Sequence, residues 1–248
     1  MQIEPKQMRL DSIKLPNEWK ELLHKELQSD EFERIRAHYY QALRLGATIY
    51  PPPNLTFNAF NLTLPKDIKI VILGQDPYHG SVQVRLFSAD SHNVCEIPQA
   101  MGLSFSVPKP LPPPPSLKNI YKELAQSVGF KIPTHGDLSA WARKGVFLLN
   151  SILSVEAHKP TSHKHFGWEK FSDSVISAIS LHCDGVVFLL WGNYAKKKAT
   201  LIDASKHCII TAPHPSPLAQ GFVGSGVFVK ANQYLSATQG KAFDWSVE

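Results

Sequence analysis

The sequence predicts an α/β fold: a single domain whose central, mainly parallel four-stranded sheet is flanked by helices on both faces, in three layers. Four short runs of Val, Ile and Leu occur at residues 69–73, 146–149, 186–191 and 208–212, with helix-like segments between them. The runs are continuously apolar, as expected for strands buried on both faces of a parallel sheet. Alternation of such strands with helices is typical of one doubly covered sheet.

The first part of the chain is predicted to be helical. Residues 17–45 form two amphipathic patterns that are separated near Ser29 and Asp30, and Gly46 with the prolines after it ends the second. We interpret residues 1–46 as an N-terminal helical segment that packs on the rest of a single domain spanning 1–248. A length of 248 residues suits one domain with a full core.

Three further helices are expected between the strands. The first starts at Ser116, whose hydroxyl is a suitable N-cap, and ends at Gly129. The second starts at Asp137 and ends at Gly145, and the third covers residues 168–183. The proline-rich stretch before Ser116 is read as a rigid loop, because regular elements continue on both sides of it.

The charge distribution is compatible with a polyanionic partner. The net charge is +5; Lys and Arg balance Asp and Glu at nine each over residues 1–68 and outnumber them 17 to 12 over 69–248. The three cysteines show no metal-ligand spacing and are expected to be free thiols. The sequence shows no signal peptide and no membrane-spanning segment, so we expect a cytoplasmic protein.

Polar residues follow each of the four apolar runs. Gln75 and Asp76 come after the first, Asn150 after the second, Gly192 and Asn193 after the third, and His214 after the fourth. The carboxyl ends of parallel strands meet at one edge of a sheet, where open α/β sheets bind their ligands. A single such residue is more often a turn or a cap, but four in phase predict a shared pocket.

Several catalytic classes are disfavoured by their missing motifs. The chain has neither the dinucleotide-binding GxGxxG nor the phosphate-binding GxxxxGK[ST] pattern. A triad of Asp76, His214 and Ser216 is discounted, because there is no GxSxG elbow and Ser216 lies between two prolines. The histidines at 162–165 lack a metal-ligand spacing, so we expect no metal.

Six motifs resemble those of the family 1 uracil-DNA glycosylases. They occur in that family's order and approximate spacing from about residue 45 onward: GQDPYHG (74–80), GLSFSV (102–107), PPPPSLKNIYKEL (112–124), LLN (148–150), GVVFLLWG (185–192) and APHPSPL (212–218). The resemblance implies a DNA repair enzyme that flips uracil out of DNA and hydrolyses its bond to deoxyribose. The product is an abasic site, and no cofactor takes part.

The resemblance also implies the roles of the pocket residues. Asp76 would position the attacking water and stabilise positive charge on the sugar, and His214 would donate to uracil O2. The remaining base-binding residues would be Gln75, through its backbone; Tyr78, beside C5, where it excludes thymine; Phe105, stacked on the ring; and Asn150, on the O4 and N3 edge.

The remaining motifs would contact the DNA backbone. Expected contacts are Pro115, Ser116, Gly192, Asn193 and Ser216, and Leu218 would fill the gap left by the flipped base. A loop leucine tucked into the core is the alternative for Leu218. The partner would be uracil-containing DNA, single- or double-stranded. The protein is expected to be a monomer and to bind neither a membrane nor a metal. Proteinaceous inhibitors that mimic DNA are further possible partners.

Some positions depart from the family pattern. An insertion loop occupies residues 81–97, Met101 replaces a usual His, Asn193 a usual Ser, and Ala219 the Ser after the wedge leucine. Two alternative functions stay open on the residues alone: a module that binds uracil without cleaving it, and a small-molecule hydrolase or nucleosidase.

Overall fold

The centre of the molecule is a four-stranded parallel sheet. The computed structural model describes residues 14–88 and 91–247. The strand order is β5–β2–β7–β8, and every neighbouring pair is parallel. The strands are β2 (Ile70–Gly74), β5 (Val146–Asn150), β7 (Val187–Trp191) and β8 (Cys208–Ala212). They coincide with the four apolar runs, so the predicted sheet is confirmed.

Continuous apolar runs form these strands because the sheet is covered on both faces. All five residues of β2, β5 and β7 are buried. In the register, Ile70 lies opposite both Val146 and Val187, and Gly74 lies opposite Asn150. The carboxyl ends of the strands therefore meet at one edge, as the parallel arrangement requires.

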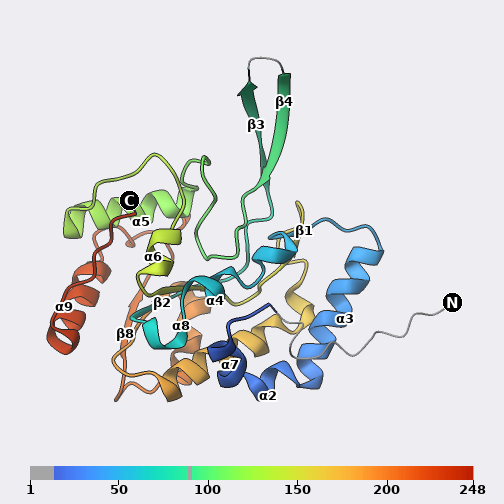
Figure 1. Ribbon diagram of the computed structural model, residues 1–248. Coiled ribbons are helices and arrows are strands. Elements are labelled where there is room, and N and C mark those ends of the chain that lie inside the picture. Colours follow the sequence, from blue (N-terminus) through green and yellow to red (C-terminus); the bar gives the residue numbers. More distant parts are fainter. Residues whose placement is uncertain (1–13, 89–90, 248) are drawn as a thin grey trace.

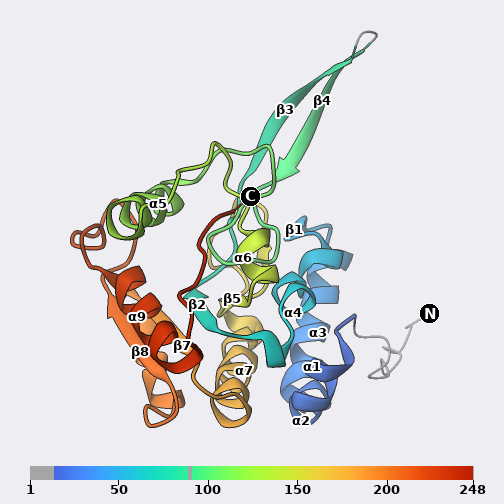
Figure 2. The ribbon, with the colours of Figure 1, turned by 60° about the vertical axis from the view of Figure 1, so that its left-hand side comes forward.

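Helices surround the sheet. Figure 2 shows α9 beside β8 at one end of the molecule and α1 to α3 at the other. The helices are α1 (Asn17–Leu22), α2 (His24–Leu27), α3 (Asp30–Arg44), α4 (Asn58–Leu62), α5 (Pro115–Val128), α6 (Ser139–Arg143), α7 (Trp168–His182), α8 (Gly192–Lys196) and α9 (Val227–Gln239). Short 3-10 turns are η2 (Pro53–Leu55), η3 (Pro65–Asp67), η4 (Lys164–Phe166) and η5 (Lys197–Leu201). None of the helices in the described ranges is long and apolar enough to cross a membrane.

The N-terminal helices are anchored in the core by Trp19. Its indole Nε1 donates to the Thr63 carbonyl at 2.9 Å, and its ring stacks on Phe147 of β5 with centroids 5.0 Å apart. The predicted break lies before α3, where the Ser29 hydroxyl caps the helix by accepting from the Phe32 N–H at 3.2 Å. A second break at residue 23, between α1 and α2, was not expected.

Two predicted helix starts are wrong by one or two residues. Helix α5 starts at Pro115, with Pro114 as its N-cap, so Ser116 is the second helical residue and forms no side-chain cap. Proline suits the first turn because its fixed φ is helical and it has no N–H to satisfy. Helix α6 starts at Ser139, and the Asp137 carboxylate accepts from the Ser139 N–H at 2.8 Å.

The segment expected as an insertion loop at 81–97 is instead a β-hairpin. Strands β3 (Ser81–Ser88) and β4 (Ser91–Pro98) pair antiparallel and project away from the body (Figure 1). A second small antiparallel pair joins β1 (Ile49–Tyr50) to β6 (Val155–Glu156). The alternation of Val82 and Val84 with polar Ser81 and Gln83 is a strand pattern that the expectation of a loop overlooked.

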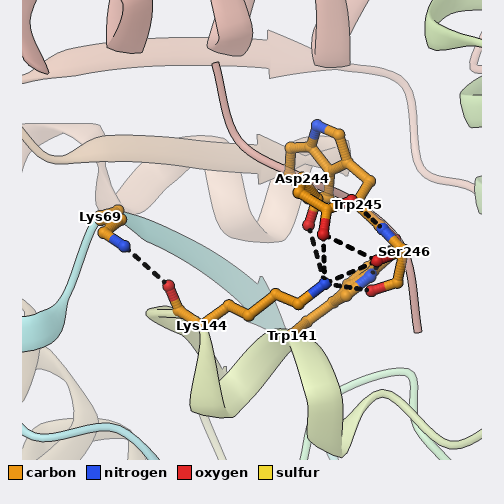
Figure 3. Close-up of polar contacts among 6 residues, drawn as sticks. All are labelled: Lys69, Trp141, Lys144, Asp244, Trp245 and Ser246. Carbon is orange, nitrogen blue, oxygen red and sulfur yellow. Dashed lines mark hydrogen bonds and ion pairs between the residues drawn. The ribbon is translucent and has the colours of Figure 1, made fainter. Parts of the chain in front are cut away.

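The C-terminal segment is fastened to α6 and its C-cap, Lys144 (Figure 3). The Lys144 ammonium donates to the Asp244 carboxylate at 2.7 Å and to the Ser246 carbonyl at 2.9 Å. The indole Nε1 of Trp141 donates to the Trp245 carbonyl at 2.6 Å. The bond from Lys144 lowers the pKa of Asp244 to about 2. These contacts bring together residues a hundred positions apart in the sequence.

Candidate active site

A cavity of about 630 Å³ opens beyond the carboxyl ends of the central strands. Its walls come from the turn after β2, the end of β5, the loop before α5 and the loop after β8. All six residues predicted to bind or cleave the base line it: Gln75, Asp76, Tyr78, Phe105, Asn150 and His214. The pocket expected from the strand ends is therefore present.

Asn150 is the last residue of β5 and is nearly buried, with 7% of its surface exposed. It lies beside Gly74, its partner in the register of the sheet. Within the described ranges, no hydrogen bond engages its side-chain amide. The amide lines the cavity, so it is available to pair with a ligand that presents a matching edge.

Asp76 is the half-buried carboxylate of the cavity. One of its oxygens accepts from the backbone N–H of Thr161 at 3.2 Å. Burial raises the pKa of Asp76, and the Thr161 N–H and nearby His79 oppose that rise. At neutral pH this group is a poorly hydrated carboxylate, which favours interaction with positive charge in the cavity.

His214 is oriented by its own loop. The backbone N–H of Ser216 donates to Nδ1 of His214 at 3.0 Å, so Nδ1 is an acceptor and the neutral ring carries its proton on Nε2. Burial lowers the pKa of His214, which favours this neutral form. Gly192 packs against the ring, and a Cβ at residue 192 would lie 3.0 Å from the Cβ of His214.

Phe105 has a backbone conformation that is rare for its residue type. Its φ is +62°, a left-handed value that costs a bulky residue about 1–3 kcal/mol. The ring lies 5.6 Å from Trp191 and 6.1 Å from His214, centroid to centroid. The Tyr78 hydroxyl donates to the Phe105 carbonyl at 3.4 Å, and burial raises the pKa of Tyr78. Such strain is typical of residues whose position serves a ligand.

Three of the predicted DNA-contact residues also line the cavity, namely Ser116, Ser216 and Leu218. Leu218 is 97% exposed, which excludes the alternative that it is a core leucine. The Ser216 hydroxyl accepts from the Leu218 N–H at 3.2 Å, so the two residues form one tight turn.

The other three predicted DNA contacts lie outside the lining. Pro115 is exposed at the first position of α5, and Asn193 is exposed in the first turn of α8. Gly192 is not part of the cavity lining and packs against His214. The structure therefore joins the base-binding residues in one site and leaves these three at its margin.

The prediction missed two polar residues of the site, Thr161 and His79. Thr161 has a φ of +59° and supplies the N–H on Asp76. His79 lines the cavity, and its buried Nδ1 has no partner among the described residues. His79 lies within the GQDPYHG motif, which could have identified it, whereas no local pattern marks Thr161.

The site has the chemistry of a cleft for a flat polar ring. It combines one carboxylate, a neutral imidazole donor, a nearly buried amide and an aromatic face. Across residues 14–88 and 91–247, no cluster of three or more His, Cys, Asp or Glu could hold a metal ion. A lone carboxylate beside a bound ring can stabilise a cationic transition state.

Comparisons with known proteins agree with this geometry. Residues 61–236 match the family model of the uracil DNA glycosylase superfamily. The chain is 60% identical over 238 residues to a uracil-DNA glycosylase of Helicobacter hepaticus, covering 96% of this chain and 98% of the relative. Identity to the Campylobacter lari uracil-DNA glycosylase is 52% over 239 residues, covering 96% and 97%.

Solved structures give the same result. The crystal structure of mimivirus uracil-DNA glycosylase superposes with a TM-score of 0.85 at 31% identity, covering 96% of this chain and 89% of that one. A mimivirus UNG variant in complex with UGI also has a TM-score of 0.85, at 32% identity, covering 96% and 91%.

Proposed function

Because the chain belongs to the uracil DNA glycosylase superfamily and hydrolyses the N-glycosidic bond of uracil in DNA, we propose that Asp76 and His214 are its catalytic residues. The reaction is the first step of base excision repair. The observation that carries the assignment is the convergence of Asp76, Asn150 and His214 on one cavity. These residues are separated by up to 138 positions (214 − 76), and only the parallel sheet brings them together.

Asp76 stabilises the positive charge that develops on the deoxyribose as the base departs, and it orients the attacking water. Its partial burial supports this role, because Coulomb attraction to a cation is stronger in a poorly hydrated site. The Thr161 N–H fixes one oxygen and leaves the other for water or sugar. Nearby His79 has an unpaired buried nitrogen and is a second group that this water can satisfy.

His214 donates its Nε2 proton in a hydrogen bond to uracil O2, where negative charge gathers. The Ser216 N–H on Nδ1 supports this direction, since it leaves Nε2 as the donor. A neutral donor does not repel the cationic sugar as an imidazolium would. Gly192 lets the ring pack closely without a side chain between them.

Base selection comes from four residues around the ring. Asn150 pairs with O4 and N3–H of uracil, a pattern that cytosine reverses. Phe105 stacks on the face, Tyr78 fills the space beside C5 and rejects the thymine methyl, and Gln75 contributes its backbone. The near-burial of Asn150 supports strong discrimination, because a mismatched edge leaves its amide unpaired.

DNA is held at the rim of the cavity. Leu218 occupies the gap left by the flipped nucleotide, which offsets part of an unstacking cost of about a few kcal/mol. Its exposure supports that role. Phosphates contact Ser116 and Ser216 beside the cavity and, farther out, Pro115, Gly192 and Asn193.

Further aspects of the assignment are also proposals. We propose that residues 1–248 form a single domain that works as a monomer on single- or double-stranded DNA. Bacterial relatives support action in the cytoplasm, and we propose that the protein works there on the DNA of the nucleoid. The mimivirus UNG structures with UGI support the existence of proteinaceous inhibitors that bind this chain in place of DNA.

One assay tests the assignment. The protein is incubated with a single-uracil oligonucleotide and with free deoxyuridine, without added metal, and the DNA is then treated with alkali. We expect alkali-labile breaks in the DNA alone, and a loss of turnover by orders of magnitude in Asp76→Asn with DNA binding retained. Unchanged turnover in that variant would remove Asp76 from the mechanism, and cleavage of free deoxyuridine would favour a nucleosidase.

A further inference from the structure

One side of α5 contacts the loop that carries Leu218. The Asn119 side-chain amide donates to the Pro215 carbonyl at 2.9 Å. One turn further on, the Glu123 carboxylate accepts from the backbone N–H of Gly226 at 2.8 Å and from that of Gly224. Positions 119 and 123 are four apart and lie on the same side of the helix. The loop is therefore tied to α5 on both sides of Leu218.

Glu123 is a carboxylate that the proposed mechanism does not use. Its residue is completely buried, at 0% exposure. Removing a carboxylate from water is costly unless hydrogen bonds compensate, and both of its oxygens accept backbone N–H groups of the loop. Gly226 is also the N-cap of α9, where the helix dipole favours negative charge.

The loop depends on these hydrogen bonds because its backbone includes positive φ values and its tip, at Leu218, is exposed. Gly224 and Gly226 have φ values of +88° and +68°, which only glycine adopts without strain. Phe222 is buried and meets Trp191 with ring centroids 5.0 Å apart. Leu218 itself has almost no protein contact, so its position depends on how the chain around it is fixed.

We infer that Glu123 is a positioning residue that presents Leu218 to duplex DNA and thereby favours activity on double-stranded over single-stranded substrate. The inference rests on the proposed role of Leu218. A flipped base leaves a gap only inside a duplex, and a single strand has no partner to displace. Loosening the loop should therefore reduce activity on duplex DNA and spare single strands.

The test variant is Glu123→Gln. Glutamine keeps the shape and one acceptor, but its NH₂ group meets one of the two backbone N–H donors, which breaks that hydrogen bond. We expect kcat/KM for duplex DNA with one uracil to fall about tenfold, as for one lost charge-assisted hydrogen bond. The value for the same strand alone should stay close to that of the control.

The matched control is Glu18→Gln. Glu18 is exposed on α1, far in sequence from the loop, and its substitution makes the same change in net charge. This matters because losing any acidic group strengthens the general attraction to DNA. Amide hydrogen exchange at residues 219–226 should speed up in Glu123→Gln and stay unchanged in Glu18→Gln.

Leu218→Ala and the double variant Glu123→Gln/Leu218→Ala separate the positioning role of Glu123 from the wedge role of Leu218. If Glu123 acts through Leu218, the duplex-specific losses of the single variants will not add in the double variant. Additive losses, or equal losses on both substrates in Glu123→Gln, would overturn the inference. No duplex-specific loss in Leu218→Ala would instead refute the proposed wedge. If Glu123→Gln does not fold, Asn119→Ala takes its place. That variant removes the hydrogen bond to Pro215, and the same comparison of duplex and single-stranded substrates then tests the inference.

Discussion

The side-chain oxygen of Asn150 occupies the space that a β-carbon on residue 74 would need. A Cβ built on Gly74 lies 2.2 Å from Oδ1 of Asn150 and 2.9 Å from the Cβ of Ser104. Gly74 ends β2 directly opposite Asn150 at the end of β5. The glycine that opens the GQDPYHG motif is therefore required for space rather than for a special backbone angle.

Gly74→Ala is expected to displace the Asn150 amide and to impair uracil binding. Overpacking costs about 1–3 kcal/mol, so kcat/KM on a uracil oligonucleotide should drop by about ten- to a hundredfold. Gly129→Ala is the control: nothing lies within 4 Å of its added carbon, but its φ of +71° is strained. Gly129→Ala should have a lower melting temperature and unchanged activity. Full activity in Gly74→Ala would contradict the claim that a Cβ at residue 74 displaces the Asn150 amide.

Tyr78→Ala is expected to release thymine from DNA. The Tyr78 ring lines the cavity, and its removal would leave space for the thymine methyl group. The measurement is free thymine released from a normal oligonucleotide, beside uracil release from a matched one. Continued exclusion of thymine by a folded Tyr78→Ala protein would place the steric gate elsewhere.

Asn150→Asp is expected to begin releasing cytosine. A protonated carboxyl group in place of the amide offers an acceptor oxygen to the cytosine amino group and an O–H donor to cytosine N3. Uracil release should decline at the same time, because buried polar mismatches cost about 1–3 kcal/mol. Cytosine and uracil release from otherwise identical oligonucleotides gives the preference, and an unaltered ratio would mean that another group reads this edge.

The activity is expected to fall in acid as Asp76 takes up a proton. Burial raises the pKa of Asp76 above its ordinary value of 3.8, so the loss should begin at higher pH than for an exposed aspartate. Burial lowers the pKa of His214, which favours its neutral form. The profile of kcat/KM against pH on single-stranded DNA measures this. The residual activity of Asp76→Asn should not show this fall of kcat/KM at low pH. If the fall persists in Asp76→Asn, another group causes it.

Stability is expected to decline in acid through His163. Trp168 Nε1 donates to the Ser154 hydroxyl at 2.8 Å, and the same hydroxyl is hydrogen-bonded to Nδ1 of His163 at 2.8 Å. Burial lowers the pKa of this neutral ring from 6.5 to about 4. The unfolded chain binds the proton first, so stability is full above pH 6.5 and is lost as the pH falls toward 4.

The loss should amount to about 1–2 kcal/mol, after allowance for solvent screening. Denaturant unfolding between pH 7 and 4 measures it. In His163→Asn the free energy of unfolding should decline less as the pH falls. The matched variant His182→Asn, at an exposed histidine, should show the same slope as the original protein. An equal slope in all three proteins would show that other groups cause it. Activity should also suffer, because His163 lies two residues from Thr161, which holds Asp76.

Much of the fold could be predicted because its signals are local. Runs such as residues 146–149 and 186–191 are apolar at every position, which only a strand buried on both faces requires. Parallel pairing then placed Asp76, Asn150 and His214 at one edge, and the structure has them around one cavity. The motifs added the chemistry to that location.

Other features depended on contacts between distant segments. The Thr161 N–H on Asp76, the strained φ of Phe105 and the burial of Glu123 arise where loops far apart in the sequence meet. The hairpin at 81–98 is different, because the alternation at residues 81–84 is a local strand signal that was overlooked.

The sequence by itself determined the four strands of the central sheet and the edge of the sheet that carries the polar groups, because periodicity and strand direction are properties of short segments. Only the tertiary structure decided the proton position on His214, the free amide of Asn150 and the exposure of Leu218. These depend on hydrogen-bond partners and packing neighbours, and a linear pattern does not specify which distant residues will supply them.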